Sequence, residues 1–231
     1  MGKTKIDWAT DSINVVTGCL NNCDYCYARK MAFRLKGRFG YPKDEPFRPT
    51  FHPDKLDEIY NLRGAHHRIF LDSMGDWYSN GVEEGWIIRV LDAIRCKDMS
   101  TFLILTKRPD RIPYLWTYPR NLWFGTTITK QNDLWRLDAL KKNAEVMHKF
   151  VSFEPLHGPI KVDLSDIDWV IIGAESGNRK GKIVPEVEWV QQICHQAKGK
   201  PVFLKNNLRS VMSIGQLPLV KLRHEFPVEM I

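Results

Sequence analysis

Short apolar runs that alternate with amphipathic stretches dominate this sequence. The runs are rich in β-branched and aromatic residues, and most are apolar at every position, as in Phe102-Leu-Ile-Leu and Trp169-Val-Ile-Ile. Strands buried on both faces have this composition, whereas half-exposed strands alternate with polar residues. The pattern therefore predicts a parallel sheet covered by helices. The expected strands cover residues 13–17, 68–72, 101–106, 122–127, 149–153, 169–173 and 201–205.

The stretches between these runs carry apolar residues at helical spacing, which predicts helices over about 27–35, 83–97, 131–144 and 186–198. Strand and helix alternate about six or seven times without a repeat or a Ser/Gly linker, which indicates one α/β domain. The 231 residues lie near the lower end for an eightfold barrel of about 250 residues, and residues 154–168 are too few for a full helical layer. We expect an incomplete parallel β/α barrel of about six or seven strands spanning residues 1–231, with segment 37–53 as a loop or lid.

Composition excludes several other classes of protein. The chain is 43% hydrophobic and 26% charged, an ordinary globular balance that argues against a disordered chain. No apolar run approaches the roughly 20 residues of a membrane span, and the N-terminus lacks the apolar stretch of a signal peptide. We therefore expect a cytoplasmic protein without membrane contact. The net charge of +7 suits an anionic partner such as a nucleotide, a nucleic acid or a phosphorylated metabolite.

Three cysteines, Cys19, Cys23 and Cys26, lie within eight residues. The spacing C-x3-C-x2-C puts three thiolates on one loop, where they can ligate three corners of a cubane iron–sulfur cluster and leave one iron open to a small molecule. Zinc is the alternative, either in an α/β enzyme or as a structural metal in a non-catalytic nucleic-acid-binding protein. A run of thiolates without a fourth ligand nearby favours iron–sulfur chemistry. Cys96 and Cys194 fall on apolar helix faces, and we expect them to be buried thiols.

The cysteine motif, with the aromatic Tyr25 before its third cysteine, resembles the signature of the radical S-adenosylmethionine (radical SAM) superfamily. The segments Val16-Thr-Gly-Cys, Cys26-Tyr-Ala and Val202-Phe-Leu-Lys are similar to a subfamily met in phages and prophages, whose function is unassigned. The resemblance implies that the three cysteines hold a [4Fe-4S] cluster whose open iron binds the methionyl group of SAM. It also implies that SAM is cleaved reductively, with an electron donor such as flavodoxin or ferredoxin, and that a 5′-deoxyadenosyl radical abstracts hydrogen from the substrate.

Polar residues follow most of the expected strands, and the carboxyl ends of parallel strands share one rim. One of these ends reads Asp72-Ser-Met-Gly-Asp76, which departs from the Gly-Gly-Glu common in the family. The resemblance implies these contacts with SAM: Tyr25, Gly173 and Glu175 near the adenine, Ser73 and Asp76 at the methionyl amine, Thr126 and Thr127 at the ribose hydroxyls, and Lys107 at the methionyl carboxylate. The remaining polar groups expected in the cavity, as catalytic candidates, are Lys205, Glu154 and Asp72.

A basic and aromatic segment follows the cysteines. Residues 29–43 contain six Lys or Arg and no acidic residue, with Phe33, Phe39 and Tyr41 interleaved. A nucleic-acid groove needs cations for phosphates and rings for bases, although a solvated helix face has a similar composition. The sequence thus predicts a radical SAM enzyme whose substrate is unidentified, with a nucleotide or nucleic acid favoured.

Overall fold

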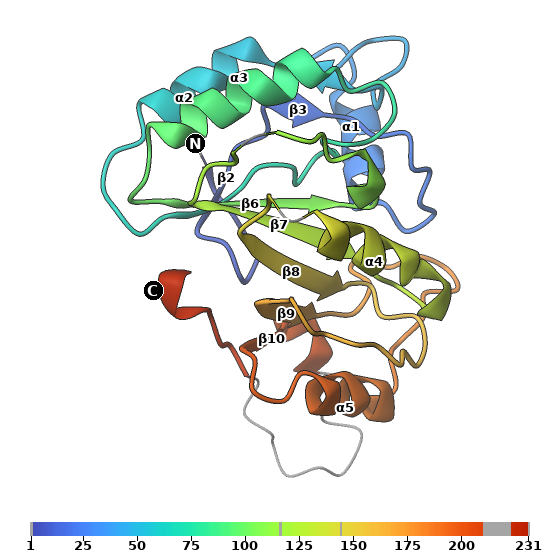
Figure 1. Ribbon diagram of the computed structural model, residues 1–231. Helices are drawn as coiled ribbons and strands as arrows, with labels where there is room; N and C mark the ends of the chain where they lie inside the picture. Colours follow the sequence, from blue (N-terminus) through green and yellow to red (C-terminus); the bar gives the residue numbers. More distant parts are fainter. Residues whose placement is uncertain (1, 116, 144, 210–222, 231) are drawn as a thin grey trace.

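The computed structural model describes residues 2–115, 117–143, 145–209 and 223–230 (Figure 1). Within these residues, the central sheet has the strand order β1-β2-β5-β6-β7-β8-β9-β10. β1 is antiparallel to β2, and the other seven strands run parallel to one another. The sheet curls into a half-barrel, which confirms the predicted partial barrel of α/β class. Its strands are β1 (Gly2–Lys3), β2 (Asp11–Ser12), β5 (Arg68–Phe70), β6 (Thr101–Thr106), β7 (Leu122–Thr127), β8 (His148–Phe153), β9 (Trp169–Ile172) and β10 (Val202–Leu204).

The helices α2 to α5 lie along this sheet from one of its ends to the other, with α4 beside β7 and β8. In Figure 1, α2 and α3 lie beside one end and α5 beside the other, next to β10. Between β8 and β9 the described chain has no helix, as expected, and four buried residues, Leu156, Ile160, Leu164 and Ile167, join the core there. The expected helix over 131–144 is shorter in the structure, and its last residue lies outside the described residues. The helices are α1 (Tyr27–Leu35), α2 (Leu56–Tyr60), α3 (Glu84–Arg95), α4 (Trp135–Lys142) and α5 (Val187–Gln196).

Each face of the sheet carries its own buried cluster. On the outer face, apolar residues of α3, α4 and α5 pack against the strands. On the inner face, aromatic rings fill the amino-terminal half of the half-barrel: Trp8, Phe70, Trp123, Phe150, Trp169 and Phe203. Gly125 makes room for one of them, because a Cβ at that position would lie 2.3 Å from the Phe150 ring. The rings leave the carboxyl-terminal half of the interior for a cavity.

The beginning of the chain differs most from expectation. Residues 13–17 do not form one strand, because the chain leaves the main sheet after β2, and β3 (Val16–Thr17) pairs instead with β4 (Thr50–Phe51). This pairing anchors the end of segment 37–53 beside the cysteine loop. Cys96 is exposed at the end of α3, and Cys194 is half-buried, so neither is the fully buried thiol that the helix pattern predicted. Within the described residues, no helix has the length and apolar character needed to cross a bilayer.

Candidate active site at the carboxyl edge of the sheet

A cavity of about 500 Å³ opens inside the half-barrel at the carboxyl ends of its strands. All three motif cysteines, Cys19, Cys23 and Cys26, line this cavity. Trp8 and Phe70, from the inner aromatic cluster, line it as well. The structure also brings these expected site residues together around it: Tyr25, Asp72, Ser73, Asp76, Lys107, Thr127, Glu154, Glu175 and Lys205.

Two expected site residues, Thr126 and Gly173, do not line the cavity. Thr126 precedes Thr127 on β7 and so faces the other side of the sheet, where its buried hydroxyl donates a hydrogen bond of 2.9 Å to the carbonyl of Thr106. Gly173 leaves room for neighbouring side chains, because a Cβ there would lie 2.9 Å from Cδ of Lys205 and 3.2 Å from Cδ of Glu154. Neither residue is among those that line the cavity, and their contacts with SAM stay predictions.

The cysteine loop is fixed by two segments that lie far from it in the sequence, residues 47–48 and 74–79. Gly18 begins the loop with a φ of +85°, which favours glycine, and a Cβ at this position would lie 2.1 Å from the carbonyl oxygen of Arg48. The loop and the chain at Gly75 also form an isolated parallel bridge through Gly18. The backbone N–H groups of the loop donate to the carbonyl of Met74 (from Gly18, 2.9 Å), the carbonyl of Phe47 (from Cys19, 3.0 Å) and the hydroxyl of Ser79 (from Leu20, 2.8 Å).

Backbone N–H groups reach two of the three sulfur atoms. Asn21 donates to Sγ of Cys19 at 3.3 Å, and Arg29 donates to Sγ of Cys26, the residue that caps the N-terminus of α1, at 3.3 Å. Burial and the nearby Asp76 raise the pKa of the Cys19 thiol to about 12. A bound metal is the kind of group that reverses such a shift, because it holds the thiol as a thiolate. Among the described residues, no three His, Cys, Asp or Glu side chains are arranged to hold a single metal ion.

Asp76 ties the cysteine loop to the end of β6. Its side chain is buried, and one carboxylate oxygen accepts from Nδ2 of Asn21 at 2.6 Å and from the N–H of Lys107 at 2.9 Å. The other oxygen accepts from the hydroxyl of Thr106 at 2.7 Å and from the N–H of Tyr78 at 3.1 Å. Four donors satisfy a buried carboxylate, so Asp76 positions the loop through contacts within the protein.

Asp72 and Ser73 follow β5 on the same wall of the cavity. Asp72 accepts from the N–H of Leu105 at 3.2 Å, and Ser73 donates its hydroxyl to Oδ1 of Asn14 at 3.1 Å. Burial, and then the charge of Asp76, raise the pKa of Asp72 well above its usual range. This environment favours the protonated carboxyl, which can donate a hydrogen bond into the cavity.

The opposite strand end carries a carboxylate held by an arginine. Glu175 is buried and accepts two hydrogen bonds from Arg179, at 2.7 Å and 2.8 Å, which keep the pKa of Glu175 below its usual range. Arg179 also lies 3.2 Å from a carboxylate oxygen of Asp24, between the second and third cysteines. The ring of Tyr25 meets His157 edge to face, with 5.4 Å between centroids. This part of the cysteine loop is therefore joined to the chain after β9.

Several of these residues were not expected from the sequence. Arg179 lies in an irregular loop after β9, where no periodicity marks a functional residue. Asn21 lies between the first two cysteines, at a position where the motif allows any residue, and its partner Asp76 is distant in sequence. Trp8 lines the cavity at 2% exposure, and its indole N–H has no hydrogen-bond partner within the part of the chain that the structure describes. Only tertiary structure brings these side chains to the site.

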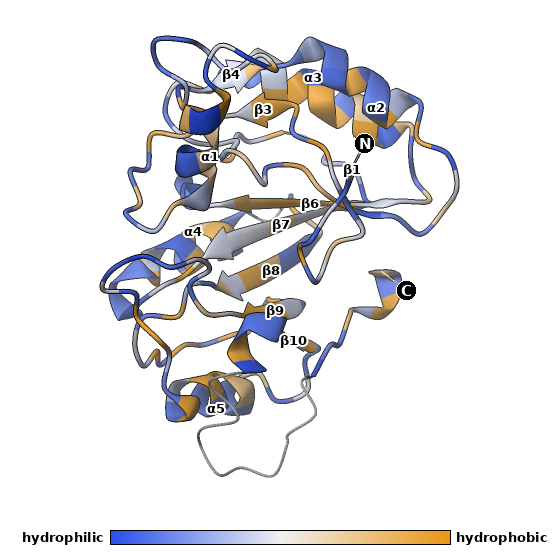
Figure 2. Ribbon diagram, turned by 180° about the vertical axis from the view of Figure 1, so that it is seen from behind, coloured by the Kyte–Doolittle hydropathy of each residue, from blue (hydrophilic) through white to orange (hydrophobic). Residues whose placement is uncertain are grey.

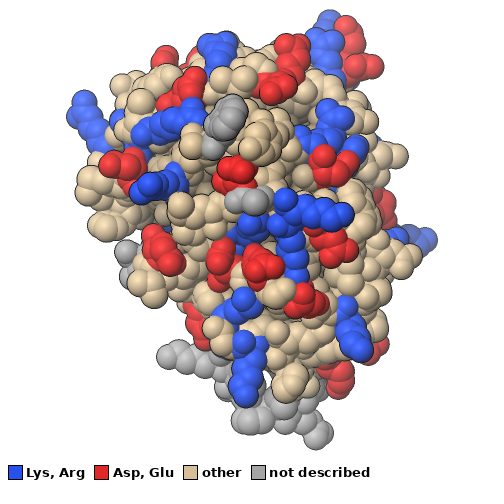
Figure 3. Space-filling model, in the orientation of Figure 1, with Lys and Arg blue, Asp and Glu red and all other residues tan. Residues whose placement is uncertain are grey.

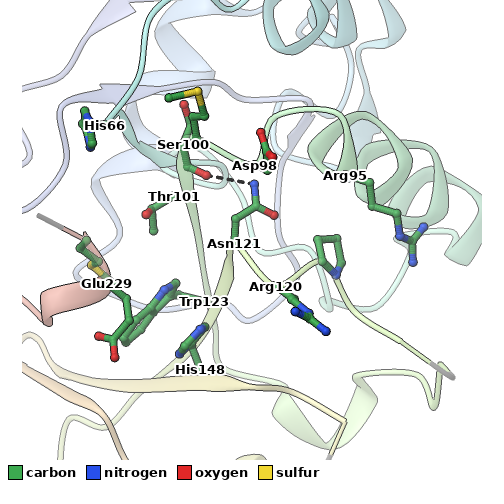
Figure 4. Close-up of a pocket in the computed structure, with 13 residues that line it drawn as sticks. His66, Arg95, Asp98, Ser100, Thr101, Arg120, Asn121, Trp123, His148 and Glu229 are labelled. Atoms are coloured by element: carbon green, nitrogen blue, oxygen red, sulfur yellow. Dashed lines mark hydrogen bonds between the residues drawn. The ribbon is translucent and has the colours of Figure 1, made fainter.

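A second hollow, of about 620 Å³, lies at the amino ends of β6, β7 and β8 (Figure 4). In it, Trp123 stacks on His148 with 4.5 Å between centroids. Asn121 donates its amide to the carbonyls of Ser100 (3.0 Å) and Lys97 (2.8 Å), so it ties the strand ends together. None of the motif cysteines lines this hollow. The chemistry-bearing residues gather at the carboxyl edge instead.

Comparison with solved structures gives spore photoproduct lyase. One variant of that enzyme aligns with a TM-score of 0.56 at 14% identity, over 86% of this chain and 64% of that chain. Its complex with dinucleoside spore photoproduct gives a TM-score of 0.53 at 13% identity, over 86% and 64%. A variant with bound AdoMet and dinucleoside spore photoproduct gives 0.51 at 12%, over 94% and 65%. This chain thus spans less than two thirds of those proteins, and the low identities show a shared fold.

Comparison with curated proteins gives no match. A family model described as protein of unknown function (DUF5131) matches residues 3–207. The matched region runs from β1 past β10, and it includes the cysteine loop and the strand ends around the cavity. Because the match covers most of its length, the chain belongs to the DUF5131 family.

Proposed function

We propose that this protein is a radical SAM enzyme that acts on a nucleotide or nucleic-acid substrate. The observation that carries the proposal is that Cys19, Cys23 and Cys26 line one cavity of a parallel half-barrel, together with the polar strand ends. The shared fold with spore photoproduct lyase supports it, because one of those structures contains bound AdoMet and a dinucleoside. The net charge of +7 suits an anionic substrate.

The donor set fits an iron–sulfur cluster. Three soft sulfur ligands on one loop leave a coordination position open for SAM, and the N–H donors at two of the sulfurs tune such a cluster. When bound, the cluster supplies the electron that cleaves SAM reductively and so initiates hydrogen abstraction from the substrate; a flavodoxin or ferredoxin is the proposed source of that electron. The Gly18 turn and the Asp76 hydrogen bonds hold the loop in place.

The side chains around the cavity supply binding and orientation. The ammonium group of Lys107 lies 5.7 Å from the centroid of the Tyr25 ring, and both residues line the cavity. We assign Lys107 to the methionyl carboxylate of SAM, Tyr25 to its adenine and Thr127 to its ribose. Ser73 and Asp76 form the wall proposed for the methionyl amine, with Asp76 acting through the loop that it holds.

Three further groups that line the cavity are proposed to contact the substrate. Lys205 and Glu154 form an ion pair on the cavity wall, and Asp72 lies on the same cavity with a raised pKa. We assign them to hydrogen bonding with the substrate and to holding protons beside it. The aromatic floor of Trp8 and Phe70 excludes water from this end of the barrel.

Electron paramagnetic resonance (EPR) tests this proposal directly. We expect the anaerobically reconstituted and dithionite-reduced protein to give a [4Fe-4S] signal that changes when SAM is added. Alanine variants of Cys19, Cys23 and Cys26 should lose the signal, whereas Cys96→Ala, which removes an exposed cysteine outside the motif, should retain it. Stoichiometric zinc in place of iron would refute the proposal in favour of a zinc enzyme or a structural metal site.

A further inference from the structure

One face of α1 presents an exposed stripe in which cations and apolar side chains alternate. Tyr27, Lys30, Met31 and Arg34 follow the helical spacing that puts side chains on one face. All four are exposed, with exposed fractions of 53% for Tyr27 and 40% for Met31. Arg38 extends the stripe beyond the helix, because its guanidinium donates to the carbonyl of Arg34 at 2.8 Å.

The buried side of α1 explains why the stripe faces outward. Ala28 and Ala32 are buried against Tyr41 and Phe47, which belong to segment 37–53. The segment therefore covers one side of the helix, and the stripe lies on the other side. Figure 2 shows α1 on the side of the molecule toward which β6, β7 and β8 point.

The stripe begins at the candidate active site. Cys26 caps the helix, and Tyr27 lines the cavity and donates its hydroxyl to the carbonyl of Ser73. From Tyr27 to Arg34 the helix advances about 10 Å, at about 1.5 Å per residue. A bound chain that follows the stripe would thus enter the cavity at Tyr27.

Two exposed phenylalanines flank the cations. Phe33 is 56% exposed and Phe39 is 79% exposed. Phe39 has a φ of +52°, an uncommon conformation for a bulky residue. Large rings held in solvent beside cations match the two needs of nucleic-acid strands, stacking for bases and positive charge for phosphates.

The cations of α1 have no acidic residue within the helix to balance them. α1 contains Arg29, Lys30 and Arg34 and no acidic residue, and Lys30 and Arg34 are four residues apart, where like charges destabilise a helix. By contrast, blue and red side chains are intermixed over the face in Figure 3. A polyanion bound along the stripe would neutralise the repulsion.

We infer that this stripe, with Phe33 and Phe39, is the docking surface for a single-stranded nucleic acid whose target nucleotide enters the cavity. The inference rests on the proposed function, because it names the form in which the substrate is presented. Exposed rings favour a single strand over a duplex, since unpaired bases are free to stack. The charges favour a polyanion over a neutral protein partner.

A fluorescence anisotropy titration tests whether the cations of the stripe bind phosphates. It measures the affinity of the full chain for a fluorescein-labelled 20-nucleotide oligo(dT) over a range of salt concentrations. The test variant combines Lys30→Gln, Arg34→Gln and Arg38→Gln, the three cations of the stripe. Each lost phosphate contact reduces the log–log salt slope by about 0.7, so we expect a slope smaller by about 2 and an affinity at least about tenfold weaker at 0.1 M salt.

The charge-matched control combines Arg63→Gln, Arg120→Gln and Lys198→Gln, three exposed residues in the connections that precede β5, β7 and β10. It should retain the affinity and the slope of the parent. For the rings, Phe33→Ala should weaken binding about tenfold, while Tyr60→Ala, which removes an exposed ring of α2, should not.

Equal losses in the test and control triple variants would overturn the inference, as would a parent protein that binds a duplex of the same length more tightly than oligo(dT). Absence of oligo(dT) binding, with a SAM-sensitive EPR signal intact, would overturn the docking surface and leave the radical SAM proposal standing. Absence of the [4Fe-4S] EPR signal, with stripe-dependent binding intact, would refute the radical SAM proposal and support the docking surface alone. The two proposals therefore fail separately.

Discussion

Substitution of Gly18 by alanine should dislodge the cysteine loop. A Cβ at this position would lie 2.1 Å from the carbonyl oxygen of Arg48, 2.4 Å from its carbonyl carbon and 2.8 Å from the carbonyl oxygen of Phe47. All three contacts are with backbone, so the collision cannot be relieved by a side-chain rotation. The φ of +85° costs alanine about 1–2 kcal/mol, and separation of the two segments breaks the hydrogen bond between Cys19 and Phe47, worth about 1 kcal/mol.

We therefore expect Gly18→Ala to lower the free energy of unfolding by about 2–4 kcal/mol in urea titrations and to reduce the iron bound after reconstitution. Gly199→Ala is the matched control, because Gly199 has a φ of +84° but no atom within 4 Å of the added Cβ. The control should lose only about 1–2 kcal/mol and should bind iron like the parent. Equal destabilisation of the two variants, with equal iron content, would refute the argument that close backbone packing holds the loop.

Three other substitutions probe the walls of the cavity. Asp76→Ala leaves four donors without their acceptor, and we expect the free energy of unfolding in urea titrations to fall by about 3 kcal/mol. SAM binding measured by calorimetry should also be weaker. Unchanged stability would contradict the role of Asp76 in holding the loop. Arg179→Gln removes both hydrogen bonds to the buried Glu175 and should lower the free energy of unfolding at pH 7. Because Arg179 lowers the pKa of Glu175, the pairing stabilises the fold above the unfolded pKa of about 4.3 and is lost as pH falls through the lowered value, so parent and variant should converge in acid unfolding. Gly173→Ala pushes against Lys205 and should reduce the yield of 5′-deoxyadenosine by chromatography more than it reduces the melting temperature.

The sheet was predictable because a strand that is buried on both faces is apolar at nearly every position. Strands such as Phe102-Leu-Ile-Leu and Trp169-Val-Ile-Ile are apolar throughout, since one face meets helices and the other meets the aromatic interior. The two-residue strands β3 and β4 were not predictable in this way. Their pairing depends on a contact between residues 16–17 and 50–51, which no local pattern records.

The candidate site was predictable only where residues sit at strand ends or in the cysteine motif. The parallel topology brings those ends to one rim, so residues such as Lys107 and Glu154 line the same cavity. No local sequence pattern indicates that they lie near each other. Thr126 shows the limit of this reasoning, because a shift of one residue along β7 changes which face a side chain occupies. Arg179 shows another, since its contacts with Glu175 and Asp24 depend on the path of an irregular loop.

The attachments of the cysteine loop have a consequence for the order in which the protein matures. The cysteines leave the ribosome before the groups that fix their loop, which lie at Phe47, Asp76 and Arg179. A nascent chain that ends before residue 179 therefore carries the three thiols without the arginine that joins them to the far rim. For the proposed cluster, we expect iron and sulfide to be delivered to the completed domain and not to the emerging chain.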